Sequence, residues 1–473
     1  KIGQINHLLD GSIDHRGRKI TSLDEKQVEE LVKDLVSNKV NDLAIIGKFS
    51  TRNPLLEENL QEIIEKSTNI TNIQLGNMIA PRLNFPRRVH TTWLNTAVYH
   101  KNQTFLSGIK EAIRERGIHA RLYLLKADGG TLPLEEGQKR GVETIKSGPA
   151  ASIMGFLALA STEKRTSLLL DVGGTTTDLA LMTNSHPLFE PDGVTIDEYI
   201  TSIRGLLNRS IPYGGDSRII IEDGQAKLAP ERVGPAVAFG GQEPTLTDAL
   251  VIIEEMEVDQ KEKAIQAIEK LSNELDITSL NLARQVVNYF YSTIREYVSK
   301  IIEELNSQPV YTIHELLEDT QIEPEVVMMI GGPAQQLLPG LARELELEPI
   351  LLPYHHVANA LGAALARPTL SHSLYADTSQ NYYRLSGVEG KEKINGSFTM
   401  EEARQILIDY IKSLIEENDK LKIDQNQIQI THQESFNLVR NFSTQGQIIK
   451  LEGQIQPGIN YQLATIPKSE VIR

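Results

Sequence analysis

The stretch LLLDVGGTTTDLAL, residues 168–181, decides the fold of this chain. It starts as an apolar run of strand length, residues 167–172, which two glycines then interrupt. Asp171 and Asp178 flank the turn, where a hydrated Mg2+ would find oxygen ligands. An aspartate that ends a buried apolar run is costly unless it has a function. We therefore interpret the stretch as a phosphate-binding β-hairpin, rather than as a plain hairpin whose aspartates lie in solvent.

The turn supplies the groups that would hold the phosphate. Gly173 and Gly174 can adopt the positive φ of a tight turn, and their amides can approach an anion. Thr175, Thr176 and Thr177 favour a returning strand and add hydroxyl donors. No GxGxxG motif opens a helix after this strand, and no GxxxxGK[ST] loop occurs. The hairpin is thus a phosphate-binding element of another kind.

A second strand that ends in glycines follows later in the chain. The sequence EVVMMIGGPAQQLLPGLAREL, residues 325–345, predicts a strand, a turn at Gly331 and Gly332, and a helix after Pro333. The glycines let the backbone approach a flat ligand, and the first amides of the helix point toward it. Taken alone, this pattern is more often simply a tight turn.

The motifs together resemble the hydantoinase/oxoprolinase family, within the superfamily of actin-like, sugar-kinase and Hsp70 ATPases. The resemblance covers most of residues 1–367, and the motifs occur in the family's order. It rests on DGSIDHRGRKI (10–20), GKFSTRNP (47–54), ADGGTLP (127–133), KSGPAA (146–151), the hairpin, GGQEPTLTDAL (240–250), MIGGPAQQLLPGLAREL (329–345) and PYHHVANALGAALA (353–366).

The resemblance implies an α/β fold with actin-like ATPase (ribonuclease H-like) domains, and ATP and Mg2+ as cofactors. It implies that residues 173–177 hold the β- and γ-phosphates and that Asp171 positions Mg2+ or the attacking group. Asp178 would support the loop. Residues 331–333 would contact the adenosine. Closure of two lobes around the nucleotide would exclude water from the site.

A glycine loop lies where many family members carry a GAGGGS-like loop. It reads Tyr213-Gly214-Gly215-Asp216-Ser217, so Asp216 adds a carboxylate to the expected glycines. That carboxylate could bind metal, orient a substrate amide or cap the turn, and turn capping is as good an interpretation as chemistry. Gly214, Gly215 and Asp216 are therefore candidate site residues with both explanations open.

In function, the resemblance implies that ATP phosphorylates the oxygen of a lactam or ketone, which makes ring opening or carboxylation easier. The leading hypothesis is a hydrolase that opens a cyclic amide. The alternatives are an ATP-binding subunit or regulatory module of a carboxylase-like complex, and a noncatalytic relative. The family also suggests a small-molecule substrate and a partner subunit of hydantoinase B type, and a homo-oligomer stays open.

One departure from the family concerns the start of the sequence. The family carries a first phosphate hairpin, GxDxGGTxTD, at its N-terminus, whereas residues 1–10 read KIGQINHLLD. We therefore expect that the sequence as given completes only half of an ATP site. The absence of an initiator Met favours a longer natural protein over a reduced relative.

Composition narrows the functional class. The chain has 473 residues and a net charge of -15 at pH 7, which opposes nonspecific binding to nucleic acid or to anionic membranes. It has no cysteine, which excludes disulfides, thiolate metal sites and a cysteine nucleophile. No apolar run approaches the length of a membrane span. A cytoplasmic protein is expected.

Three regions are predicted. Residues 1–160 alternate helix and strand as a partial first lobe, with a buried strand expected at 41–50 and a helix at 149–160 whose small residues permit close packing. Asp128 is interpreted as part of an Asp-Gly turn rather than as a catalytic residue.

Residues 161–367 form an ATPase-like lobe, in which the alternating pattern of 191–230 predicts antiparallel strands. The lobe has a helical segment at 248–318 that includes a long core-packed helix at 280–305. Residues 368–473 form a C-terminal α+β domain after a boundary near Pro368. The adjacent His355 and His356 are placed beside a strand end and are assigned no metal.

Overall fold

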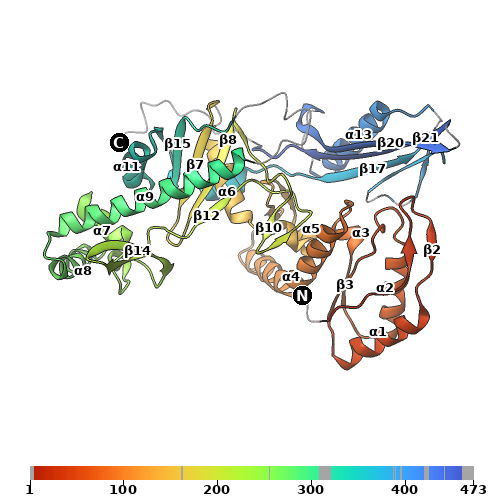
Figure 1. Cartoon of the computed structure of the whole chain (residues 1–473), viewed down its shortest axis with the longest axis horizontal. Helices are drawn as coiled ribbons and strands as arrows, with labels where there is room; N and C mark the ends of the chain where they lie inside the picture. Colours follow the sequence, from red (N-terminus) through yellow and green to blue (C-terminus); the bar gives the residue numbers. More distant parts are fainter. Residues whose placement is uncertain are drawn as a thin grey trace.

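The structure is a computed structural model. It describes residues 5–160, 163–254, 256–307, 321–386, 388, 390–394, 397–419, 425–440 and 443–460. Figure 1 shows an elongated molecule in which the lobe with the hairpin of β7 and β8 lies at one end. The N-terminal helices and the C-terminal sheet lie together at the other end.

A six-stranded mixed sheet forms the centre of the hairpin lobe. Its order is β12-β8-β7-β15-β16, with β9 paired to the far end of β8. β7 runs parallel to β15, and β15 to β16, whereas β8 is antiparallel to both β7 and β12. The strands are β7 (Ser167–Val172), β8 (Thr177–Thr183), β9 (His186–Pro187), β12 (Arg209–Ile211), β15 (Val326–Gly331) and β16 (Glu348–Leu351).

Helices cover both faces of this sheet, which is why β7 is almost continuously apolar. Leu168 and Leu170 pack on the face that holds α7, α9 and α11, whereas Leu169 packs on the face that holds α6 and α12. The helices are α6 (Ser147–Leu159), α7 (Leu246–Ile253), α8 (Lys261–Glu274), α9 (Ser279–Asn306), α11 (Ala334–Leu345) and α12 (Ala358–Leu365). α7 begins two residues before the helical segment predicted at 248–318, α8 and α9 lie within that segment, and residues 308–320 lie outside the described residues.

Helices α6 and α12 pack unusually close together because glycines face each other across them. A Cβ on Gly155 would lie 2.2 Å from the carbonyl oxygen of Ala358, and one on Gly362 would lie 1.9 Å from that of Ala151. The close approach expected of the small-residue helix is therefore confirmed, and it brings the side chains of α12 to the sheet edge.

Between β8 and α7 the chain forms short antiparallel pairs, as its alternating pattern predicts. β10 pairs with β11, and β13 pairs with β14. The last pair packs beside α7 and α8 at the end of the lobe (Figure 1). These strands are β10 (Thr195–Ile196), β11 (Tyr199–Ile200), β13 (Ser217–Glu222) and β14 (Gln225–Arg232).

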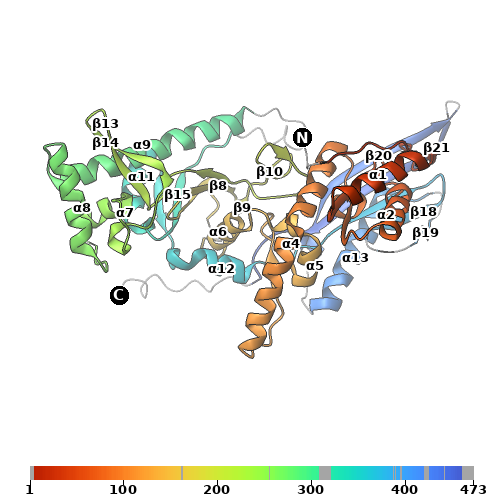
Figure 2. The same ribbon diagram turned by 90° about the horizontal axis from the view of Figure 1, so that it is seen from below.

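The N-terminal region is α/β, but its strands are shorter and less buried than predicted. Residues 41–50 were expected to form a buried strand, whereas β3 covers only Asp42–Ile45 and pairs with β4 alone. A two-stranded sheet buries one face, so of β3 only Ile45 is buried. Figure 2 shows α4 projecting past the other elements. The elements are β1 (Ser12–Ile13), β2 (Lys19–Thr21), α1 (Glu25–Ser37), α2 (Leu55–Ser67), β4 (Asn72–Leu75), α3 (Gly76–Ile79), α4 (Phe85–Glu115), β5 (Tyr123–Leu125), β6 (Thr131–Pro133) and α5 (Leu134–Lys139).

The C-terminal region is an antiparallel five-stranded sheet that packs against α13. The order is β19-β18-β17-β21-β20, and β17 begins three residues after Pro368, where the sequence predicts only a boundary. The elements are β17 (Ser371–Asp377), β18 (Tyr382–Leu385), β19 (Glu392–Lys393), α13 (Met400–Asp419), β20 (Ile428–Arg440) and β21 (Ser443–Ile455). The division of the chain at 160 and 367 stays a prediction. Among the described helices, none combines the length and apolar character that crossing a membrane requires.

Candidate functional site

The predicted hairpin forms at the carboxyl end of β7, and its two aspartates face each other. Asp171 on β7 is the direct cross-strand partner of Asp178 on β8. Opposed like charges destabilise a strand pair. Burial raises the pKa of Asp178, and the charge of Asp171 raises it further. The pair is therefore a place where a cation would relieve repulsion.

The turn exposes a set of free amide donors. Gly173 donates its N–H to the carbonyl of Thr176 at 3.0 Å, which closes the turn. Within the described residues, the N–H groups of Gly174, Thr175 and Thr176 donate no hydrogen bond to the protein. Gly174 and Thr175 are exposed. Unpaired backbone amides that converge at a turn form an anion-binding concavity.

The expected reason for the two glycines is wrong in detail. Neither Gly173 nor Gly174 has φ in the left-handed region. Gly174 is needed because of a neighbour instead: a Cβ there would lie 2.5 Å from Oδ2 of Asp216. The turn thus needs glycine to admit the 213–217 loop rather than to relieve its own backbone.

That loop holds the hairpin turn from one side. Gly215 donates its N–H to the carbonyl of Gly173 at 2.9 Å, and Asp216 donates its N–H to that of Gly174 at 2.7 Å. Gly214 has no room for a Cβ, which would lie 2.6 Å from the carbonyl oxygen of Gly173. These donors are used to fix the turn. A direct contact between the loop amides and a nucleotide stays a prediction.

The carboxylate of Asp216 is also engaged. Its Oδ2 pairs with Nη2 of Arg232 at 2.8 Å, and its Oδ1 accepts the N–H of Ala236 at 3.2 Å. These bonds support the interpretation of Asp216 as a residue that holds loops together. A catalytic role for it stays a prediction.

Asp171 is oriented by two polar residues that sequence reasoning missed. Ser152 of α6 donates its hydroxyl to Oδ2 of Asp171. Asn359 of α12 donates its side-chain N–H to the Ser152 hydroxyl at 2.9 Å and to the carbonyl of Gly148 at 3.1 Å. Burial raises the pKa of Asp171. The available signal was a serine in the middle of one apolar helix and an asparagine near the start of another.

The second glycine element reaches the same edge of the sheet. Gly331 ends β15 beside Val172 in parallel register, with φ of 104°, and a Cβ there would lie 2.2 Å from the carbonyl oxygen of Val172. Gly332 is exposed and has no atom near its Cβ position. Pro333 lies 3.9 Å from the Cβ position of Gly215. Ligands of α/β sheets bind at the carboxyl ends of parallel strands, which is where these residues meet.

His355 is part of this edge, and it lies beyond the end of β16 and near Gly331, as the sequence predicted. His355 and His356 lie in a short 3-10 helix, His355–Val357, and not in a strand. His355 Nδ1 lies 3.2 Å from the carbonyl oxygen of Gly331, so it supports the glycine turn. The described residues contain no cluster of three or more His, Cys, Asp or Glu side chains that could hold a metal by themselves.

A Mg2+ ion could nevertheless fit here, since Mg2+ in nucleotide sites keeps several waters and needs only one or two carboxylates besides the phosphates. Asp171 and Asp178 supply those carboxylates, and the turn amides supply donors for phosphate oxygens. The arrangement is thus suited to hold a phosphate together with a divalent cation.

Two sequence profiles and two curated relatives match the chain. The sequence profile described as hydantoinase/oxoprolinase matches residues 88–372, and that of the hydantoinase/oxoprolinase N-terminal region matches residues 3–68. The chain is 25% identical over 300 residues to the acetophenone carboxylase gamma subunit of Aromatoleum aromaticum, covering 57% of this chain and 40% of that protein. It is 24% identical over 248 residues to caprolactamase subunit alpha of Pseudomonas jessenii, covering 51% of this chain and 36% of that protein. The matched segments therefore cover less than half the length of these relatives.

Two solved structures share the fold. The nucleotide-free structure of acetone carboxylase superposes with a TM-score of 0.68 at 18% identity, covering 97% of this chain and 70% of that chain. The ATP-dependent caprolactamase from Pseudomonas jessenii superposes with a TM-score of 0.65 at 17% identity, covering 94% of this chain and 69% of that chain. The predicted α/β, actin-like fold class is confirmed.

Proposed function

The chain belongs to the hydantoinase/oxoprolinase family, and on this premise we propose that it binds ATP and Mg2+ in an enzyme that opens a cyclic amide. One observation carries the proposal. The carboxylates of Asp171 and Asp178 are opposed across a hairpin whose turn presents three free amides. Two partly buried like charges beside an anion cradle are best explained by a cation and a phosphate that bind together.

The chain's own residues would bind and orient in this reaction. When bound, ATP would supply a phosphoryl group to the amide oxygen, which would make the amide carbon more electrophilic toward water so that the ring C–N bond can break. The turn amides of residues 174–176 would hold phosphate oxygens, and Asp171 would hold Mg2+ or position the attacking group. Ser152 fixes the rotamer of Asp171, and Asn359 fixes Ser152. Phosphoryl transfer depends mainly on such positioning and on charge stabilisation.

A second candidate is an ATP-binding subunit of a carboxylase-like complex. Both curated relatives are named as subunits, and one of them belongs to acetophenone carboxylase. A partner of hydantoinase B type would then perform later steps on the activated substrate. Both carboxylate oxygens of Asp216 already have protein partners, Arg232 and the Ala236 N–H. Such a structural role fits the carboxylase subunit and a noncatalytic relative as well as it fits the hydrolase.

Binding of ATP in the presence and absence of Mg2+, measured by titration calorimetry on the natural full-length protein, tests the nucleotide site. We expect Mg2+-dependent binding that Asp171→Asn weakens by about tenfold or more, because a carboxylate ligand of the cation is lost. Asp259→Asn, at an exposed carboxylate outside the site, is the matched control and should bind as wild type. Folded wild-type protein that binds no nucleotide, or an Asp171→Asn variant that binds as wild type, would contradict the proposal.

Turnover measurements distinguish the hydrolase from the carboxylase subunit. ATP hydrolysis is measured with 5-oxoproline, hydantoin or caprolactam in one series, and with acetone or acetophenone plus bicarbonate in the other. Stimulation by a cyclic amide supports the hydrolase. Stimulation by a ketone with bicarbonate, and none by the amides, supports the carboxylase subunit.

A further inference from the structure

A second concavity lies at the far end of β8 from the phosphate turn. It encloses about 480 Å³ between the end of α6, the turn that leads into β9, and the segment that follows β21. The seven residues of β8 rise by about 3.3 Å each, so the concavity is roughly 20 Å from the hairpin turn. No residue assigned above to the nucleotide site lines it.

Arg204 is the first unusual group in this pocket. Its guanidinium stacks on Phe189, with the central carbon 3.9 Å from the ring centre. Its Nη2 reaches the Gln429 side-chain oxygen only at 3.4 Å, and its Nη1 is buried with no hydrogen-bond partner. Among the described residues, no carboxylate lies within 4 Å to form an ion pair with it. Burial lowers the pKa of Arg204.

The charged groups that act on Arg204 at longer range already have ion-pair partners. Asp128, which acts on it at longer range, pairs with Lys126 at 3.1 Å and accepts the Gln454 amide at 2.7 Å. Arg82, a further positive charge nearby, is matched by Glu452 at 2.5 Å. The buried Nη1 of Arg204 therefore has no hydrogen-bond acceptor among the described residues. A buried donor without an acceptor lowers the stability of the fold.

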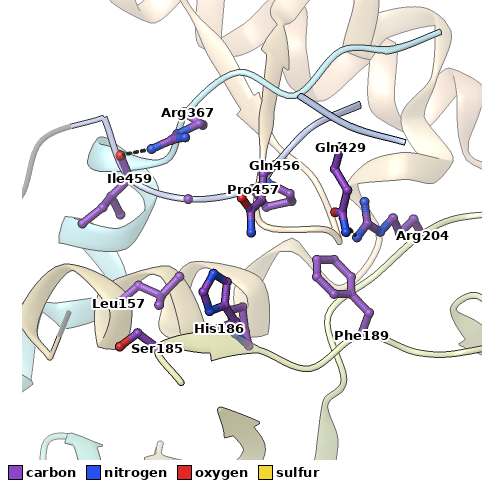
Figure 3. Close-up of a pocket in the computed structure, with 12 residues that line it drawn as sticks. Leu157, Ser185, His186, Phe189, Arg204, Arg367, Gln429, Gln456, Pro457 and Ile459 are labelled. Atoms are coloured by element: carbon purple, nitrogen blue, oxygen red, sulfur yellow. Dashed lines mark hydrogen bonds between the residues drawn. The ribbon is translucent and has the colours of Figure 1, made fainter. Parts of the chain in front are cut away.

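Arg367 is a second cation in the same pocket. Its Nη2 donates to the carbonyl of Ile459 at 2.7 Å, and no ion pair of the described residues includes it. A Cβ on Gly458 would lie 3.4 Å from its guanidinium, so the chain wraps closely around this group. Burial lowers the pKa of Arg367 too. Figure 3 shows Arg204 and Arg367 on either side of Pro457.

The rest of the wall is apolar or neutral. Leu157, Phe189, Pro457 and Ile459 supply apolar surface, Gln456 supplies an amide, and none of the described residues that line the pocket is Asp or Glu. This arrangement is notable in a chain whose net charge is -15, because the overall field repels anions. Burying two arginines without a carboxylate beside them costs folding free energy, and a bound anion would offset that cost.

We propose that this pocket binds a small organic carboxylate, whose charged group lies beside the arginines that have no ion-pair partner and whose apolar part lies against the leucine, isoleucine and phenylalanine side chains. Arginine presents planar donors that match a carboxylate. The volume lies within the range of small-molecule sites. The site is separate from the nucleotide site, so the inference does not rest on the proposed function.

Thermal unfolding of the whole chain with butyrate as the probe tests the proposal. Butyramide is the uncharged control of the same shape, inorganic phosphate is the alternative anion, and NaCl keeps the ionic strength constant. We expect a saturable rise in Tm with butyrate and none with butyramide. If phosphate alone produces the rise, or if no probe does, the carboxylate assignment is wrong.

Two variants separate a binding role from a structural one. Arg204→Met keeps the apolar stem over Phe189 but removes the charge, so we expect at least about a tenfold loss of butyrate affinity with an unliganded Tm equal to or above that of wild type. Gln456→Glu places a carboxylate in the wall and should also weaken butyrate binding. Arg114→Met, at a side chain that is 81% exposed, is the control and should bind as wild type. Wild-type butyrate affinity in both pocket variants would overturn the proposal, whereas ATP binding, measured in parallel, reports on the other site.

Discussion

Replacing Asp128 by Asn should strongly destabilise the protein, because this carboxylate is the centre of a buried polar cluster. Asp128 is 3% exposed. It accepts the Gly130 N–H at 2.9 Å, the Lys126 ammonium at 3.1 Å and the Gln454 amide at 2.7 Å. The sequence pattern here favours no more than an Asp-Gly turn. The structure instead joins β5, β6 and the C-terminal sheet through this one side chain.

The magnitude follows from what Lys126 loses. Breaking a buried ion pair costs about 3–5 kcal/mol, since it leaves one charge buried without its partner. Lys126 keeps the carbonyl of Thr369 at 2.8 Å and has Glu143 at 3.9 Å, which places the expected loss near the lower end. Asn keeps the shape and the oxygen that accepts from Gly130. We therefore expect Asp128→Asn to lower the free energy of unfolding by about 3 kcal/mol.

Urea unfolding followed by tryptophan fluorescence measures this loss. The chain has one tryptophan, Trp93, and it packs against the cluster that contains Ala127, next to the substituted position. Asp259→Asn, at an exposed carboxylate, should stay within about 0.5 kcal/mol of wild type. Adding Lys126→Met to Asp128→Asn should recover part of the loss because no orphan charge remains. A loss below about 1 kcal/mol, or no recovery in the double variant, would refute the reasoning.

Three further predictions concern the site and its core. Gly331→Ala should cost about 1–3 kcal/mol in urea unfolding, because φ is 104° and the new Cβ would meet the carbonyl oxygen of Val172. Asp178→Asn should raise the Tm at about pH 7. Burial, and then the charge of Asp171, raise the pKa of Asp178, so its stabilising contribution is present below 3.8 and is lost as the pH rises through the raised value. The Tm difference between variant and wild type should therefore shrink as the pH falls to about 4, and a constant difference would contradict this. Phe290 lies on α9 and has no exposed surface in the core of the lobe. Phe290→Ala should lower the free energy of unfolding by about 3–5 kcal/mol, measured by thermal unfolding.

Much of the fold could be predicted because strong local patterns decide it. The apolar run 167–172, the long amphipathic repeat of 280–305 and the glycines of 331 and 332 each formed the element expected of them. The predictions failed where contacts with distant parts of the chain decide the structure. The strand at 42–45 is less buried than its sequence suggests, and β17 follows Pro368 without any strong local signal.

The candidate site was predicted only in its outline. Asp171 and Asp178 were found because carboxylates beside a glycine turn are locally unusual, and the structure places them opposite each other. Ser152 and Asn359 were missed, since neither has a distinctive neighbourhood in the sequence and their roles arise from the close packing of two helices. The reason for Gly174 was wrong for the same cause, because its neighbour Asp216 lies 42 positions away in the sequence (216 minus 174).

The sequence by itself determined the family, the hairpin around Gly173 and Gly174, and the strand, turn and helix around Gly331 and Gly332, because these depend on residue types at short, regular spacing. Only the tertiary structure decided which polar groups have partners. Asp216 is engaged with Arg232, whereas Arg204 and Arg367 face one pocket without a carboxylate. Hydrogen bonds and ion pairs act over a few ångströms, and the residues that they join here come from distant parts of the chain.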